Sequence, residues 1–246
     1  MVTCALVTPW WRRRVAGAGS AAGGVVPTAI LDWRDPLVQS LVRATASDDR
    51  LAGLRAAHRV IAGAVRPVYA VQERQPISRT LRRGRGSCSQ RLAILEGVAR
   101  AQGIPTRVRG LLVDGRFWYP RFPRLKSLVP SRVLVAWPEF GIDGSWVPVG
   151  ELFGPLPALA ASPGFSNDSG ETLFDAVSRT AIDWDGVTCE TGGACDLSAT
   201  VLADLGRFDS RDELFRRHGQ TVSGPLTRLI DPVLSRWAPR QSASNR

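Results

Sequence analysis

Apolar positions in the first hundred residues repeat at the spacing of an α-helix. One stripe, with steps of three and four residues, begins after Ser47 and is closed by Pro67, which predicts a helix with one buried face. Asp35 followed by Pro36 is typical of an N-cap and a first helical residue, so an earlier helix is predicted through Arg43. The later stripe consists of Leu51, Leu54, His58, Ile61 and Val65.

Two further helices are predicted on either side of a glycine-rich loop. Residues 78–83 form a short basic helical turn that ends at Gly84. Beyond the loop, apolar residues keep helical spacing from Cys88 until Gly103 and Pro105 supply a stop signal. The loop therefore delivers Cys88 to the first turn of a helix.

Alternating patterns follow this helix and predict strands. Residues 106–113 alternate arginine with apolar side chains, and Asp114-Gly115 predicts a hairpin turn into a strand over 116–122. Two more strands are predicted over 132–140 and 145–149. Helices first and an antiparallel sheet afterwards, with no strand-helix alternation, indicate an α+β fold in which the N-terminal helices pack on the sheet.

The region after Gly150 differs in composition. It is rich in proline, glycine and serine until Gly170, and three amphipathic helical segments are then predicted over 171–182, 210–218 and 225–237. The chain is therefore expected to comprise a flexible tail over 1–30, a core over 31–153, a helical C-terminal extension over 154–240 and a disordered tail over 241–246.

Composition indicates an ordinary globular protein with an unusual charge. Of the 246 residues 44% are hydrophobic and 22% are charged, which argues against a disordered chain or a membrane protein. The formal net charge is +10, almost all of it from arginine, so anionic partners are favoured. Nucleic acid, a phosphorylated ligand, an acidic carrier protein and a membrane face all fit this charge, but no DNA- or RNA-binding motif supports nucleic acid.

The four cysteines, Cys4, Cys88, Cys189 and Cys195, are scattered, so a reducing, cytoplasmic compartment is the simpler expectation. Cys189 and Cys195 could close a small loop, but no second ligand pair with zinc spacing follows, and neither a metal nor a cofactor is expected. Arginines 12–14 leave twin-arginine export as an alternative. The apolar stretch that follows them is too rich in glycine to predict a membrane span.

Several motifs resemble the signature of transglutaminase-like proteins. The run Gly-Arg-Gly-Ser-Cys-Ser-Gln at 84–90, its helix, and Gly-Ile-Pro-Thr-Arg at 103–107 resemble the central part of that signature. The run Val-Ala-Trp-Pro-Glu-Phe at 135–140 resembles a strand that normally reads His-Ala-Trp-x-Glu, and residues 144–150 resemble a strand that normally ends in aspartate. Val135 and Gly150 therefore stand at the histidine and aspartate positions of the family.

The resemblance implies a papain-like site in which Cys88 attacks a carboxamide, ester or thioester. The N-terminus of a helix favours a thiolate, and Arg82, Arg83 and Arg85 before the loop would add to this effect and are candidates for binding an anionic substrate. Valine and glycine cannot transfer a proton, however, and losing general acid-base catalysis costs about 100- to 10,000-fold in rate. The ordinary Cys-His-Asp mechanism is therefore not expected.

Other side chains are candidates for supporting roles. Glu139 and Trp137 match positions of the family motif, and His58 could act as a substitute base or be a core histidine. Trp118 and Tyr119, with the other aromatic residues of the sheet, could line a ligand cleft or fill the core.

Three functions follow from these observations. The leading one is an altered transglutaminase-like enzyme for acyl transfer, cyclisation or binding of an activated acyl substrate in a biosynthetic setting, with a small-molecule or carrier-bound acyl group. A thioester on an acidic carrier protein suits both the charge and a weak nucleophile. The alternative is a non-catalytic binding or regulatory protein in which Cys88 is a relic, and the third is a nucleic-acid binder.

Overall fold

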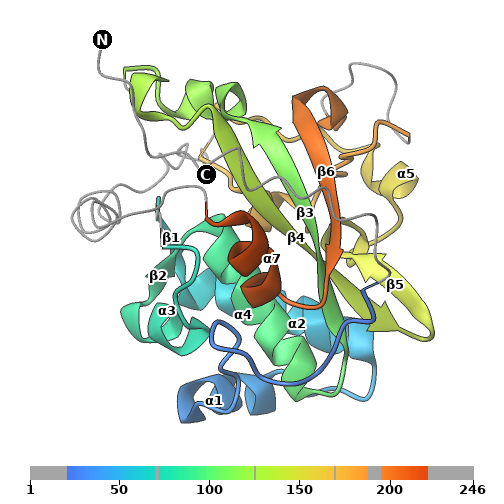
Figure 1. Ribbon diagram of the computed structural model, residues 1–246. Helices are drawn as coiled ribbons and strands as arrows, with labels where there is room; N and C mark the ends of the chain where they lie inside the picture. The colour runs from blue at the N-terminus through green and yellow to red at the C-terminus, as the bar shows by residue number, and fades with distance from the viewer. Residues whose placement is uncertain (1–20, 70–71, 125, 169, 188–194, 221–246) are drawn as a thin grey trace, which may run out of the picture.

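The computed structural model describes residues 21–220 except 70–71, 125, 169 and 188–194 (Figure 1). Four helices form the N-terminal half, and the other three pack against α4, which lies next to the sheet. These helices are α1 (Pro36–Ala44), α2 (Arg50–Ala64), α3 (Ile77–Arg83) and α4 (Cys88–Ala101). All four predicted N-terminal helices are confirmed.

Side-chain caps fix the starts of these helices. Asp35 accepts a hydrogen bond of 2.9 Å from the amide of Leu37 at the start of α1, and Asp49 accepts from two amides at the start of α2. Ser87 and Gln90 form a reciprocal capping box at α4. Each cap satisfies amides that the first helical turn leaves without partners.

A curled antiparallel sheet with the strand order β5-β4-β3-β6 lies beside the helices. Its strands are β3 (Thr106–Asp114), β4 (Arg132–Ile142), β5 (Ser145–Pro148) and β6 (Val201–Phe208). A short parallel pair, β1 (Arg66–Pro67) and β2 (Arg85–Gly86), lies apart from it, beside α3. Helices packed on an antiparallel sheet confirm the α+β class.

The predicted strand over 116–122 is wrong. Residues 115–121 form a 3-10 helix, η2 (Gly115–Arg121), which begins where Asp114 accepts a 2.9 Å hydrogen bond from the amide of Arg116. A Cβ at Gly115 would lie 1.7 Å from the carbonyl oxygen of Pro130, so the chain can pass this close only at a glycine. The strand that pairs with β3 is instead β4.

The extension is not the purely helical appendage that the sequence predicted. Only α6 (Leu173–Ala176) forms within 171–182, α7 (Arg211–His218) is confirmed, and 225–237 lies outside the described residues. Strand β6 was not predicted, because Asp204 and Gly206 are residue types typical of turns. Both lie where the register between β3 and β6 shifts. The extension therefore supplies a strand to the central sheet.

Residues 21–30, expected to belong to the flexible tail, pack on the fold. Gly24 pairs with Thr106 through two main-chain hydrogen bonds of 3.1 and 3.0 Å. Ile30 is only 2% exposed, and Asp212 of α7 accepts a hydrogen bond from its amide. These contacts use the main chain, so a search for a periodic apolar face could not find them.

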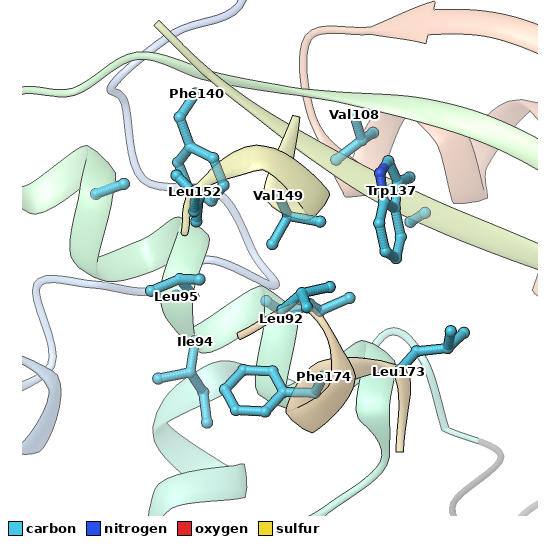
Figure 2. Packing of buried hydrophobic residues seen from close by; sticks show 14 of the residues in the cluster. Leu92, Ile94, Leu95, Val108, Trp137, Phe140, Val149, Leu152, Leu173 and Phe174 are labelled. Carbon is cyan, nitrogen blue, oxygen red and sulfur yellow. The ribbon is translucent and has the colours of Figure 1, made fainter. Parts of the chain in front are cut away.

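The core joins α4, the sheet and the extension (Figure 2). Figure 2 shows Leu92 and Leu95 of α4 between Phe140 and Val149 on one side and Phe174 of α6 on the other. Among the described residues no helix is long and apolar enough to cross a membrane.

A buried ion pair fastens α7 to α4. Arg211 and Glu96 have fully buried side chains and pair with each other. Arg211 also donates to the hydroxyl of Ser89 at 2.8 Å and to the carbonyl of Ala136 at 3.2 Å. Burial raises the pKa of the Glu96 carboxyl, and the charge of Arg211 opposes this effect. Removing either partner would leave a charge in the core.

Candidate functional site

Cys88 is the first residue of α4, as the sequence predicted. It carries a free thiol, is half-buried and packs against the hydrophobic core. Burial raises the pKa of this thiol to about 12; the charge of Arg91 opposes the rise, the charge of Asp175 adds to it, and a main-chain hydrogen bond from Phe174 opposes it. The thiol is therefore protonated at neutral pH.

Burial opposes the effect of the helix N-terminus on the Cys88 thiol. A rise from 9.0 to about 12 corresponds to about 4 kcal/mol against the charged form. The helix macrodipole contributes about 0.3–1 kcal/mol, and about 2 kcal/mol in favourable cases. Desolvation is the larger effect, so it decides the protonation state.

His58 lies in the core and not in a catalytic arrangement. Its ring is 2% exposed and stacks on Phe174, with centroids 4.2 Å apart and planes at 11°. Its Nε2 lies 2.5 Å from the Phe174 carbonyl oxygen, so this nitrogen carries the proton and donates it. Burial lowers the pKa of His58, and the hydrogen bond to Phe174 opposes the effect. No hydrogen bond joins His58 to Cys88 in the described part of the chain.

Arg91 and Asp175 fasten α6 beside the start of α4. Arg91 lies one turn after Cys88, and its side chain is 1% exposed. Its two terminal nitrogens reach the two oxygens of Asp175 at 2.8 and 3.1 Å, and one also reaches the hydroxyl of Thr172 at 3.2 Å. Burial acts to raise the pKa of Asp175, but the hydrogen bonds and charge of Arg91 outweigh it and lower that pKa.

Phe174 joins these groups. The guanidinium carbon of Arg91 lies 4.2 Å from the centroid of its ring, and His58 stacks on the same ring. Its main chain bonds both His58 and Cys88. Figure 2 shows Phe174 and Leu173 on the same side of Leu92, which belongs to α4. The extension thus places a fully buried aromatic residue against the group expected to be the nucleophile.

The histidine and aspartate positions of the resemblance hold side chains without proton-transfer groups. Val135 lies opposite Leu111 in the sheet and packs on the core. Gly150 is buried, and a Cβ there would lie 3.4 Å from both the Ile182 carbonyl oxygen and the Trp137 ring. A larger side chain at this buried position would have to fit between these two groups, and an aspartate there would bring a carboxylate into a buried site.

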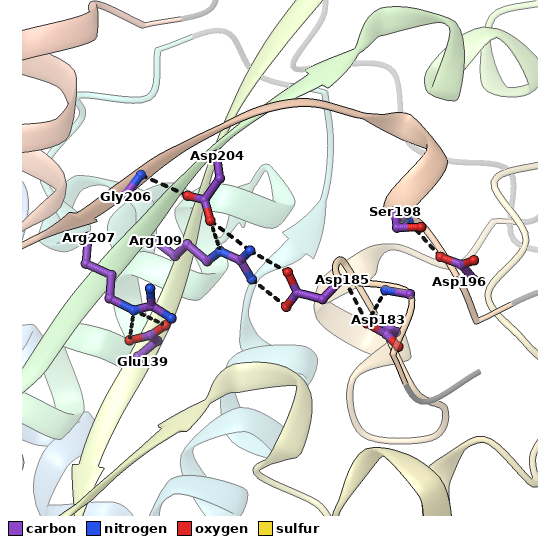
Figure 3. A network of polar contacts seen from close by, with 10 residues as sticks. Arg109, Glu139, Asp183, Asp185, Asp196, Ser198, Asp204, Gly206 and Arg207 are labelled. Carbon is purple, nitrogen blue, oxygen red and sulfur yellow. Dashed lines mark hydrogen bonds and ion pairs between the residues drawn. The ribbon is translucent and has the colours of Figure 1, made fainter. Parts of the chain in front are cut away.

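Glu139 lies in ion pairs within the sheet, and Trp137 lies in the core. Glu139 pairs with Arg107 of β3 at 2.5 Å and with Arg207 of β6 at 3.1 Å. Figure 3 shows the second of these pairs. Trp137 is 3% exposed, and its ring meets that of Trp184 edge-on at 5.5 Å. Among the described residues no hydrogen bond or ion pair joins either side chain to Cys88, and their supporting catalytic roles stay predictions.

A polar network that the sequence did not indicate holds the extension on the sheet. Arg109 of β3 binds both oxygens of Asp185, at 2.8 and 2.6 Å, and also Asp204 of β6 (Figure 3). Asp183 is 2% exposed and accepts hydrogen bonds from the amides of Asp185 and Gly186. The alternation of arginine in β3 was the only sequence signal for it.

The aromatic candidates pack on one another. The rings of Trp118 and Phe117 meet edge-on at 4.7 Å, and Phe117 contacts Phe165 at 6.1 Å. Tyr119 lies beside Lys126, whose ammonium is 6.0 Å from the ring centroid. Trp118 packs on the core cluster, which agrees with the core-filling alternative.

The three arginines before the loop do not reach Cys88. Arg82 pairs with Asp35 at 2.5 Å, Arg83 donates to Gln75 at 2.8 Å, and Arg85 lies beside Arg66 in the β1–β2 pair. Their role in anion binding stays a prediction. Among the described residues no group of His, Cys, Asp and Glu could hold a metal ion.

Cys195 is disulfide-bonded, and its partner lies outside the described residues. Disulfides persist in oxidising surroundings, so this bond counts against the reducing compartment expected from the cysteine spacing. Cys4 and Cys189 lie outside the described residues, and the compartment stays a prediction.

Residues 38–150 match the family model of the transglutaminase-like superfamily. That range ends before α6, α7 and β6, so the segment that packs on Cys88 lies outside the matched region. No curated protein and no solved structure matches the chain.

Proposed function

This chain belongs to the transglutaminase-like superfamily, and we propose that it is a non-catalytic binding protein that keeps the fold and has lost the cysteine chemistry. The observation that carries the proposal is the surroundings of Cys88. Its thiol is protonated, and α6 packs against it. In the described part of the chain no imidazole or carboxylate is hydrogen-bonded to it.

The chemistry of acyl transfer supports this reading. A thiol must lose its proton to attack a carbonyl, and the base must lie within hydrogen-bond reach. The two histidines of the chain are His58 and His218; His58 is bonded to Phe174, and His218 lies beside Phe208 of β6. Neither can relay the Cys88 proton from these positions.

The expected reactivity of the thiol follows from its pKa. A pKa of about 12 leaves about 1 part in 10⁵ of the thiol ionised at pH 7, about 3,000-fold less than a free cysteine. The higher nucleophilicity of a more basic thiolate recovers about 30- to 60-fold of this loss. Cys88 is therefore expected to react about 50- to 100-fold more slowly than a free thiol before any steric protection by α6.

The pH dependence of Cys88 alkylation by iodoacetamide tests the proposal. Labelling is followed on the Cys88 peptide by mass spectrometry, with Cys88→Ser as the background. We expect slow labelling with no inflection below pH 9. Fast labelling with an apparent pKa below 8 would refute the proposal and restore acyl transfer from a thioester, the leading function from the sequence.

A further inference from the structure

The charge of this protein is concentrated in one short stretch of sequence. Residues 59–85 contain seven arginines and one glutamate, a net charge of +6 out of +10 for the whole chain. Most of these arginines gather around α3, β1 and β2, which lie together away from β5 and β6 (Figure 1). We call Arg66, Arg74, Arg79, Arg82, Arg83 and Arg85 the arginine face.

The helix α3 presents a stripe of like charges to solvent. Ile77, Ser78 and Thr80 are its buried residues, whereas Arg79, Arg82 and Arg83 are exposed. These arginines are three and four positions apart, so their side chains are neighbours on the helix surface. Arg82 pairs with Asp35, the N-cap of α1, and Arg83 donates a hydrogen bond to Gln75.

The short strands β1 and β2 place two more arginines next to each other. Arg66 and Arg85 are direct partners in the parallel pair of β1 and β2. Neither forms an ion pair with a described residue, and the same holds for Arg74 and Arg79. Like charges placed opposite one another destabilise a fold. Arg66, Arg74, Arg79 and Arg85 thus lie within one region of the fold without an ion pair to a described residue, which is expected of a surface that a partner neutralises.

We propose that the arginine face is the docking surface of this protein for an acidic protein surface. The inference rests on the proposed binding function and names the class of partner. A guanidinium binds a carboxylate through two parallel hydrogen bonds, and it loses less hydration than an ammonium when it does so. All six cationic side chains of the face are arginines, which suits this geometry.

Nucleic acid fits the face less well. The outward side of α3 carries only arginines, with no amide or carboxylate that could read base edges. It also presents no aromatic ring on which a base could stack. A duplex would therefore be held through its phosphates alone.

The test measures binding of a fluorescein-labelled oligoglutamate peptide to the full chain by fluorescence anisotropy, at low and high salt, with duplex DNA as the competitor. The face variant combines Arg66→Ser, Arg74→Ser and Arg79→Ser, all at exposed residues without described ion pairs. The control removes the same charge elsewhere on the exposed surface, through Arg50→Ser, Arg124→Ser and Arg132→Ser.

We expect the face variant to weaken peptide binding at least about tenfold and the control to weaken it less than about threefold, with binding falling as salt rises. Equal losses in both variants would show attraction by net charge alone and would refute the arginine face as the docking surface. Tighter binding of duplex DNA than of the peptide would overturn the partner class. Cys88 alkylation in the same preparation tests the proposed function separately, because a reactive thiol would refute it without changing peptide binding.

Discussion

The ion pair between Arg91 and Asp175 offers the sharpest test of how α6 protects Cys88. Asp175→Asn keeps the shape of the side chain and its part in the α6 cap, but it leaves the buried Arg91 charge unpaired. Removing one partner of a buried ion pair costs about 3–5 kcal/mol. Asp175 is 33% exposed, so solvent screening reduces the expected cost to about 2–3 kcal/mol.

The lost free energy mainly weakens the packing of α6 on α4 and affects the stability of the whole fold less. Labelling of a protected thiol follows the population of the open state when opening and closing are fast. Each 1.4 kcal/mol changes that population tenfold, so iodoacetamide should label Cys88 about 30- to 150-fold faster in Asp175→Asn. Loss of the Asp175 charge also lowers the pKa of the thiol, and a pH series separates this effect from opening.

The matched control is Asp185→Asn, which weakens another two-oxygen pair with an arginine. Arg109 keeps Asp204, and the Asp185 side chain is 54% exposed, so the cost is about 1 kcal/mol or less. Urea unfolding confirms that both variants are folded at the labelling conditions. Unchanged labelling of Cys88 in folded Asp175→Asn would refute the idea that α6 protects the thiol.

Three other outcomes follow from the structure. Gly150→Asp introduces the family residue but should lower the urea midpoint without speeding Cys88 alkylation, because the position is buried and a carboxylate there loses hydration; faster alkylation would contradict this. Glu96→Gln should lower the free energy of unfolding in urea by about 3–5 kcal/mol, because it leaves the buried Arg211 charge without a partner. A loss below about 1 kcal/mol would contradict an ion pair shielded from water. Burial lowers the pKa of His58, so its contribution to stability is present above its unfolded pKa near 6.5 and is lost as pH falls through its folded pKa. His58→Leu should therefore reduce the difference in the free energy of unfolding between pH 7.5 and pH 5.5. An unchanged difference would refute the burial of a neutral His58.

Local signals in the sequence were enough for the four N-terminal helices, for α7 and for three of the four strands of the main sheet. Asp35, Asp49 and Ser87 begin helices through bonds to nearby amides, and such caps are visible in the sequence because their partners lie within a few positions. The alternation in β3 and β4 is equally local. Asp143 and Gly144 both have positive φ, 48° and 79°, and form the predicted tight turn before β5.

The parts that the sequence did not predict depend on contacts between distant residues. Strand β6 contains Asp204 and Gly206, and its place in the sheet comes from pairing with β3 about a hundred positions earlier. The position of Phe174 between His58 and Arg91 depends on Asp175 reaching across to α4. The prediction of a thiolate used the helix end and the nearby arginines, and it omitted the desolvation of Cys88 by the core on which it packs.

Strand β6 also bears on how the chain folds. Strand β3 joins β4 soon after synthesis, but its other edge has no partner until residue 208 has been made, and a ribosome adds about 5–20 residues per second. An apolar strand edge left open for some seconds invites pairing with other chains. Glu139 of β4 neutralises Arg107 as soon as β4 has paired with β3, whereas Arg109 keeps its positive charge until Asp185 and Asp204 have been made and packed. Arg109 would thus discourage aggregation of the nascent chain and later favour β6 as the final strand through its pair with Asp204.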